Sequence, residues 1–145
     1  MRAVIQRVCL ARVLVDARVA GEIREGLVAL VAFEKGDDEG VVARTADKLA
    51  RLRIFGDRAG KMNLSLLDTG FSALLVPNFT VAGSTCKGHR PSFDPALEPE
   101  KASALFARLV ATMEEIGVRT ESGVFGAHMS VELVNDGPVT VMLEI

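Results

Sequence analysis

The stretch Leu27-Val28-Ala29-Leu30-Val31-Ala32-Phe33 decides the class of fold. Every position in it is apolar, and the run is too short for a typical helix, so it predicts a strand that is buried on both faces. Residues 2–8, 11–16 and 19–23 precede it as alternating segments, which predict short strands joined by tight turns. The chain therefore begins with a series of strands.

Two helices are predicted further along the chain. Asp37-Asp38-Glu39 forms a capped, acidic helix start, and apolar residues then recur at helical spacing to about residue 52. Pro99 begins a second helix with a wide apolar face, which Gly117 ends. Further strands are predicted at Arg53–Phe55 and Ser72–Val76, with a turn at Asp57–Gly60 between them.

The C-terminal segment contains an unusual Gly-Pro dipeptide. Two alternating runs, Met129–Val134 and Val139–Ile145, flank Asn135-Asp136-Gly137-Pro138. The pattern alone predicts a tight turn at Asp136-Gly137, after which Pro138 starts an edge strand. A sharper interpretation is that glycine permits close approach and that a Gly-Pro bond can become cis, presenting bare carbonyl oxygens to a ligand. With strands outnumbering helices and clustered at both ends, the predicted fold class is α+β, with helices on one side of the sheet or sheets.

Composition limits the function. The 145 residues, 49% hydrophobic and 25% charged, predict a single domain over residues 1–145. A net charge of −2 and the absence of Trp and Tyr argue against a broad nucleic-acid surface, so DNA is not expected as a partner. Arginines at positions 2, 7 and 12 interrupt the N-terminus, and no apolar run reaches membrane-spanning length, so a cytoplasmic protein without a membrane partner is expected, with Cys9 and Cys86 as reduced thiols.

The stretch from Ala82 to Pro99 predicts a long, lid-like loop of the kind that carries function. It contains a short basic cluster of Lys87, His89 and Arg90. This cluster is either a solvated polar loop or a contact for one or two phosphates, which would suit an acidic protein that grips only the end of a nucleic acid.

Recognisable catalytic motifs are weak. Cys86 and His89 invite comparison with Cys/His hydrolases, and with Cys9 and His128 they could be imagined as a zinc set, but only one close pair of ligands exists. Neither a metal nor another cofactor is predicted, and the phosphate-binding and dinucleotide-binding glycine motifs are absent. Thr80, after the predicted strand that ends at Val76, could be a nucleophile or an orienting hydroxyl, but no base adjoins it in sequence.

Four segments of the chain stand out as a set: Ala3-Val4-Ile5-Gln6-Arg7-Val8; Phe55-Gly56-Asp57 with Gly60-Lys61-Met62-Asn63-Leu64-Ser65; Arg90-Pro91-Ser92-Phe93; and Asn135-Asp136-Gly137-Pro138-Val139-Thr140. Taken together, in their order and spacing, they resemble the D-aminoacyl-tRNA deacylase family over essentially the whole chain. The resemblance implies a three-layer β/β/α fold of the α+β class, with mostly antiparallel or mixed sheets and two main helices, that forms a homodimer.

The resemblance also implies roles for particular residues. It places the substrate's ester carbonyl at Phe79 and Thr80, and it makes Gly137-Pro138 a cis dipeptide that reaches into the active site of the partner subunit. Where the family typically has Ser-Gln-Phe-Thr, this chain has Pro77-Asn78-Phe79-Thr80, so a hydroxyl and a longer amide are lost while the main-chain N–H of Phe79 remains. Arg7, which holds the dipeptide, together with Asn78 and Met129 completes the implied substrate contacts, and Lys87, His89 and Arg90 are the implied tRNA contacts.

The implied activity is hydrolysis of the ester bond of D-aminoacyl-tRNA, and of mischarged glycyl-tRNA, with rejection of L-aminoacyl-tRNA. An oriented water and a stabilised oxyanion would suffice for an activated ester, so no strong side-chain nucleophile is required. Two alternatives stay open: a non-catalytic RNA-end-binding module on the same fold, and a different esterase that uses Thr80 or Cys86.

Overall fold

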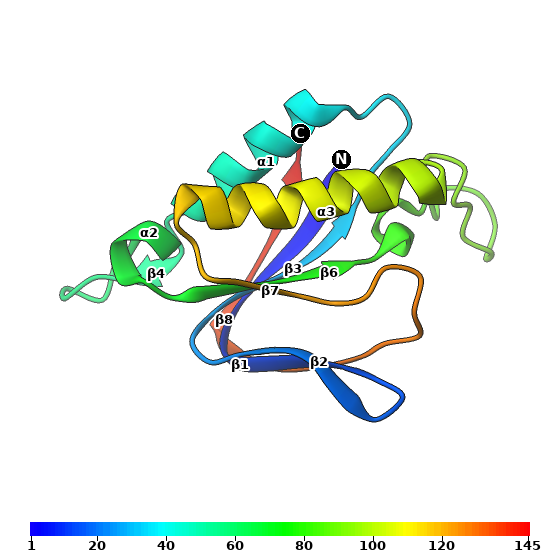
Figure 1. Cartoon of the computed structure of the whole chain (residues 1–145). Helices are drawn as coiled ribbons and strands as arrows, with labels where there is room; N and C mark the ends of the chain where they lie inside the picture. Colours follow the sequence, from blue (N-terminus) through cyan, green and yellow to red (C-terminus); the bar gives the residue numbers. More distant parts are fainter.

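Strand β1 organises the sheet. In the computed structural model, which describes residues 1–145, β1 (Arg2–Val15) pairs along one edge with β8 (Ser130–Glu144). Its other edge pairs first with β3 (Gly26–Ala32) and then with β2 (Arg18–Ile23). These three pairings are antiparallel, whereas β6 (Ser72–Pro77) and β7 (Thr120–Ser122) extend the sheet beyond β3 in parallel. The sheet is therefore mixed, as predicted (Figure 1).

Two long helices lie side by side over one face of this sheet (Figure 1). The first helix begins after Asp38, whose side chain caps it by accepting a hydrogen bond from the Val41 N–H at 3.1 Å. The second helix ends at Gly117, whose φ of 99° is left-handed. Both predicted helices are thus confirmed. The helical and remaining strand elements are α1 (Glu39–Arg51), β4 (Phe55–Gly56), β5 (Met62–Leu64), α2 (Leu66–Thr69), the 3-10 helix η1 (Phe79–Ala82) and α3 (Pro99–Ile116). None of the helices is long and apolar enough to cross a membrane.

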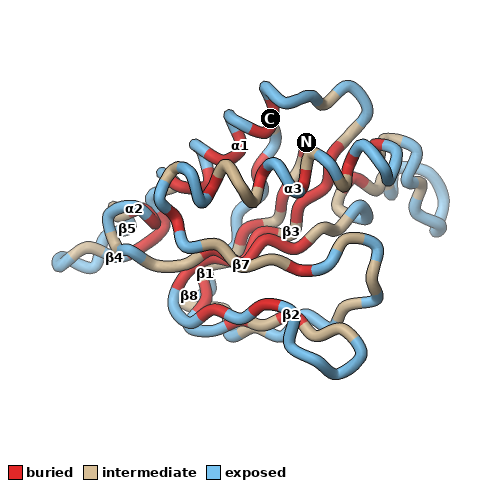
Figure 2. Tube along the Cα trace, in the orientation of Figure 1, coloured by how far each residue is buried: buried red, intermediate tan, exposed pale blue.

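Two cores fill the space between three layers. Alternate residues of β3 point to opposite faces, so Leu27 and Ala29 join a large core under α1 and α3, while Val28 joins a smaller core on the other face. The smaller core is closed by the far half of β1, by β2 and by Leu133 of β8. The layers are β/β/α, and Figure 2 shows the buried residues concentrated in the central strands and on the inner sides of the helices.

A single strand replaces the two strands that were predicted at residues 2–8 and 11–16. The break in alternation that separated them is an irregularity in the ladder with β8, between Gln6 and Leu10. Ile5 lies in the large core and Val8 in the small one, as simple alternation requires. The irregularity changes the face that the following residues meet, so Ala11 joins Val8 in the small core although the two are three residues apart. One strand therefore serves two layers.

The strand predicted at Arg53–Phe55 is also wrong in its bounds, because only Phe55 and Gly56 are paired, with β5. The turn that follows is as predicted. Asp57 accepts hydrogen bonds from the N–H groups of Lys61 and Ala59, and these bonds, with that of Lys61 the strongest, hold the pKa of the Asp57 carboxyl below its ordinary value.

The predicted hairpin turn at Asp136-Gly137 does not form. β8 pairs with β1 on both sides of this segment, Val8 opposite Asn135 and Gln6 opposite Thr140. One residue of β1, Arg7, therefore faces the four residues 136–139 of β8, which bulge out of the ladder. Because Pro138 has no N–H to donate, it is tolerated where pairing is interrupted.

Candidate active site

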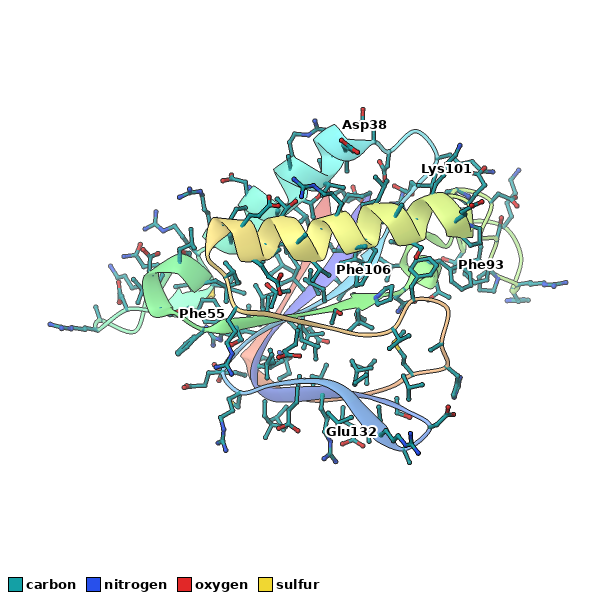
Figure 3. All side chains as sticks on the ribbon, viewed as in Figure 1. Asp38, Phe55, Phe93, Lys101, Phe106 and Glu132 are labelled. Atoms are coloured by element: carbon teal, nitrogen blue, oxygen red, sulfur yellow. The ribbon has the colours of Figure 1, made fainter.

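A cavity of about 510 Å³, which we call the main cavity for its largely apolar lining, lies where the parallel strands β3 and β6 end, beside the amino-terminal end of α3. Ligands of open sheets with parallel strands bind in this position, outside the carboxyl ends of the strands. Figure 3 labels two of the lining phenylalanines, Phe106 on the sheet-facing side of α3 and Phe93 in the loop before it. Three elements meet at the cavity: the strand ends, the start of α3 and the loop between residues 82 and 99.

The lining is largely apolar. Its apolar residues include Phe33, Leu97, Phe106 and Phe125, and its charged groups are Lys35, Asp94 and Glu98. No serine, threonine, cysteine or histidine side chain lines the cavity. The arrangement can hold an apolar or aromatic group and orient it through a few polar contacts, but it offers no hydroxyl or thiol nucleophile.

The start of η1 forms one wall. Asn78 caps this short helix: its Oδ1 accepts a hydrogen bond from the Thr80 N–H at 3.3 Å and another from the Thr80 hydroxyl. Asn78 and Phe79 line the cavity, whereas Thr80 does not. Phe79 is the first residue of the 3-10 helix, so its N–H has no acceptor inside that helix.

The loop is tied to this wall. Phe93 packs edge-to-face on Phe79, with ring centroids 5.3 Å apart. Backbone hydrogen bonds between Ser84 and Ser92, at 2.8 and 2.9 Å, close the base of the loop tip. Gly83 is required here, because a Cβ would lie 2.8 Å from the Thr80 carbonyl oxygen and 2.9 Å from the Phe93 ring. The exposed tip, residues 85–91, extends beyond this base.

The Gly137-Pro138 peptide bond was predicted to be cis, and this is wrong for the structure described: the chain contains no cis peptide bond. Trans is the ordinary form of an X-Pro bond, favoured by about 0.5–1 kcal/mol. The change of direction comes instead from Gly137, whose φ of 100° is left-handed. Asn135 closes the bulge by donating from Nδ2 to the carbonyl oxygens of Arg7 at 2.8 Å and Val139 at 3.1 Å.

Arg7 lies directly beside the dipeptide. Its Nη1 donates to the Ile54 carbonyl oxygen at 2.6 Å, and its Nε lies 2.8 Å from Asp136 Oδ2, a close ion pair whose N–H direction is not aligned as a hydrogen bond. A Cβ on Gly137 would overlap the Arg7 guanidinium. The structure therefore brings Arg7 and Gly137 into contact, as the resemblance implied, while Gly137 and Pro138 are themselves exposed.

Within one chain, this dipeptide and the main cavity do not share a site. Arg7 and Asp136 line a different hollow, together with Phe55, Gly60 and Met62 of the β4–β5 region. In Figure 1 that region lies at the left end of the molecule, whereas the loop and the start of α3 lie at the right end. No residue from 136 to 138 lines the main cavity.

The remaining predicted contacts are dispersed. Met129 lies behind the cavity wall, partly buried against the small core, and does not line the cavity. Lys87, His89 and Arg90 are all exposed in the loop tip. Cys9 and Cys86 are free and exposed, and no three His, Cys, Asp or Glu side chains gather as a metal site.

Sequence reasoning missed several residues of the cavity, among them Lys35, Leu97, Phe106 and Phe125. Lys35 follows the carboxyl end of β3, a position from which function could have been inferred had the parallel pairing of β3 and β6 been known. The phenylalanines gave no such signal, because an apolar residue that lines a cavity is indistinguishable in sequence from one in the core.

Comparison with solved structures defines the class of protein. The chain superposes with a TM-score of 0.94 and 32% identity on a structure described as a c-Myc DNA unwinding element binding protein, over 100% of this chain and 99% of that one. A probable eukaryotic D-amino acid tRNA deacylase has the same fold, with a TM-score of 0.86, 17% identity and coverage of 99% and 98%. The fold is therefore the α+β fold of the deacylases, as predicted.

Sequence comparison then defines the family. The family model described as D-Tyr-tRNA(Tyr) deacylase matches residues 4–144. The D-aminoacyl-tRNA deacylase of Pelobacter propionicus is 53% identical over 99% of both chains, and that of Carboxydothermus hydrogenoformans is 51% identical over 100% of both. The chain belongs to the D-Tyr-tRNA(Tyr) deacylase family. It is accordingly an enzyme of the hydrolase class, which confirms the resemblance seen in its sequence.

Proposed function

We propose that this protein hydrolyses the ester bond that joins a D-amino acid to the terminal ribose of tRNA. The observation that carries the proposal is the cavity itself: an apolar pocket with a main-chain N–H at its wall and no side-chain nucleophile in its lining. An aminoacyl ester is already activated, so a site that orients it and stabilises the oxyanion is sufficient. The names of the relatives support this substrate class.

The Phe79 N–H is the proposed oxyanion donor. It lies at the start of η1, where the helix offers this N–H no hydrogen-bond acceptor. Asn78 supports this geometry because its side chain caps η1 by accepting hydrogen bonds from Thr80. The Asn78 side chain thus has a positioning role at the place where the family typically carries a longer amide. The departure at Pro77-Asn78 therefore leaves the proposed donor in place.

Water is the proposed nucleophile. The Thr80 hydroxyl directs its proton to the Asn78 amide oxygen, which is not a base, and it does not line the cavity. Cys86 is exposed in the loop tip, away from the lining. The ribose hydroxyl next to the ester can help to position the attacking water, so the substrate supplies a group that the protein lacks.

We propose further that two copies of the chain form each complete site. The exposed Gly137 and Pro138 lie too far along the sheet to reach the cavity of their own chain, but a second copy could present them to it. Arg7 and Asn135 would hold the bulge rigid for that purpose. The bulge must be rigid because it can exclude a methyl group only if its backbone does not move aside.

Selection for D-amino acids then follows from exclusion. When the amino group and the ester carbonyl are both fixed, exchanging D for L swaps the side chain with the α-hydrogen. If Gly137-Pro138 packs against that hydrogen, no room remains for even a methyl group, so L-aminoacyl esters are rejected by steric overlap.

Glycyl-tRNA should be hydrolysed to a measurable extent, because glycine carries a hydrogen at both α positions and cannot be excluded in this way. The measurement is the release of labelled glycine from glycyl-tRNA at high enzyme concentration, beside D-alanyl-tRNA and L-alanyl-tRNA. Complete resistance of glycyl-tRNA, under conditions in which D-alanyl-tRNA is cleared, would contradict the exclusion mechanism.

The test of the proposed function is a deacylation assay on D- and L-aminoacyl-tRNA with the parent, Thr80→Ala and Cys86→Ala. We expect D-specific release by the parent, a nearly silent Cys86→Ala and at most a several-fold loss in Thr80→Ala. That variant loses only the bond from the hydroxyl to the Asn78 oxygen, worth about 0.5–1.5 kcal/mol, while the N–H of residue 80 still donates to the cap. Collapse of the rate in either variant would instead assign side-chain nucleophilic catalysis.

The second candidate is a non-catalytic module that binds the end of an RNA. The exposed Lys87, His89 and Arg90 in the loop tip favour contact with phosphates, whichever function is correct. Binding of D-aminoacyl-tRNA without D-specific release would establish this alternative.

A further inference from the structure

Lys35 is the only basic side chain that lines the main cavity. The three basic residues of the loop tip do not line it, and neither does Lys101 in the first turn of α3. Any anionic group that enters this cavity can therefore meet a protein cation at one place only.

The backbone fixes Lys35 at the cavity edge. The Lys35 N–H donates to the Pro95 carbonyl oxygen at 2.9 Å, and the Leu97 N–H donates to the Phe33 carbonyl oxygen at 2.9 Å, so the end of β3 is bound to the end of the loop. Lys35 is then the second residue of a four-residue turn, closed by a 3.1 Å bond from the Asp37 N–H to the Glu34 carbonyl oxygen. Gly36, with φ of 98°, is the third residue and turns the chain away from the cavity.

The acidic residues around Lys35 are already engaged. Glu34 lies 3.3 Å from Arg2 Nε and 3.8 Å from the Met1 amino group, and Asp37 lies 3.0 Å from that same amino group. Asp38 caps α1. No carboxylate, including Asp94 and Glu98 in the same lining, forms an ion pair with Lys35, so its ammonium group is free to bind a ligand.

We infer that Lys35 binds the phosphate that joins the last two nucleotides of the substrate tRNA. This inference rests on the proposed function, in which the terminal aminoacyl nucleotide occupies the cavity, and it adds the residue that recognises the nearest phosphate. A lysine ammonium is a compact charge suited to a phosphate oxygen. Because Lys35 is the only cation in a lining that also contains Asp94 and Glu98, it is the one side chain of the cavity that can attract a phosphate.

The test uses a stable amide analogue of the substrate end, 3′-deoxy-3′-(D-alanylamino)adenosine, with and without a 5′-phosphate. For the parent, the phosphate should tighten Kd about tenfold or more, in the range of a hydrogen bond to a charged group. In Lys35→Ala the two analogues should bind with Kd values within about twofold of each other, because the phosphate has lost its partner. Lys35→Arg should retain most of the phosphate effect.

Lys101→Ala is the matched control, since it removes the same charge from an exposed position outside the lining and should behave as the parent. A phosphate effect that persists in Lys35→Ala would overturn the inference, as would equal weakening of both analogues or a parent that binds neither. Because the readout is affinity, a parent that binds both analogues through Lys35 but hydrolyses no D-aminoacyl-tRNA would refute the proposed function alone.

Discussion

Phe79→Pro should lower kcat for D-aminoacyl-tRNA by about 10²–10³-fold, the loss found when one oxyanion donor is removed. Proline removes the N–H of residue 79 and leaves the rest of the main chain. It is tolerated at the first position of a helix, where the N–H has no partner within the helix, and Phe79 is the first residue of η1. The measurement is single-turnover deacylation, which reports the chemical step.

Phe79→Ala is the control for the side chain. Phe79 is 58% exposed and its ring packs on Phe93, so removal of the ring changes the cavity wall but retains the main-chain donor. We expect Phe79→Ala to keep most of kcat, with any loss appearing in KM. If Phe79→Ala and Phe79→Pro lose kcat to the same extent, the ring rather than the N–H is responsible, and the oxyanion assignment is wrong.

Gly137→Ala should reduce D-specific deacylation about 10²-fold, a loss that misplacement by an ångström can cause. Two costs combine. An alanine at the φ of 100° is strained, and its Cβ would overlap the Arg7 guanidinium, which holds the bulge through Asp136 and the Ile54 carbonyl oxygen. The measurement is kcat/KM for D- and L-alanyl-tRNA, together with the midpoint of thermal unfolding.

Gly60→Ala is the control that separates backbone strain from overlap with Arg7. The Gly60 φ of 74° is also left-handed and therefore strained for alanine, but no atom lies within 4 Å of the added Cβ. We expect Gly60→Ala to lose some stability and to keep its activity. If both variants lose activity in proportion to their loss of stability, the bulge has no specific role in the reaction.

Mixed dimers test whether Gly137 acts across subunits. If each site uses Phe79 of one chain and Gly137 of its partner, a dimer of Phe79→Pro with Gly137→Ala contains one intact site. An equal mixture of the two inactive variants, allowed to exchange subunits, should then recover roughly a quarter of the parental activity, because about half of the dimers are mixed. No recovery after demonstrated exchange would place both residues in the same subunit's site.

Local patterns predicted the helices and the central strands because their causes are local. The Asp38 cap and the stop at Gly117 are set by neighbouring residues, and the apolar run at Leu27–Phe33 belongs to a strand that is buried on both faces. The same reasoning failed at Arg7–Leu10 and at Asp136–Pro138. At both places a broken alternation was taken for the end of a strand, whereas the two segments face each other in one irregular ladder.

The sequence by itself determined the fold class, the family and the segment Pro77–Thr80 as a candidate site, since these depend on periodicity and on motifs that lie along the chain. Only the tertiary structure decided that β3 and β6 are parallel neighbours and that their ends form the cavity with α3. Only it showed that Arg7 meets Gly137 and that Lys35 stands unpaired at the cavity edge. The reason is physical: pairing between distant segments is set by the burial of the whole sheet, and no local pattern encodes it.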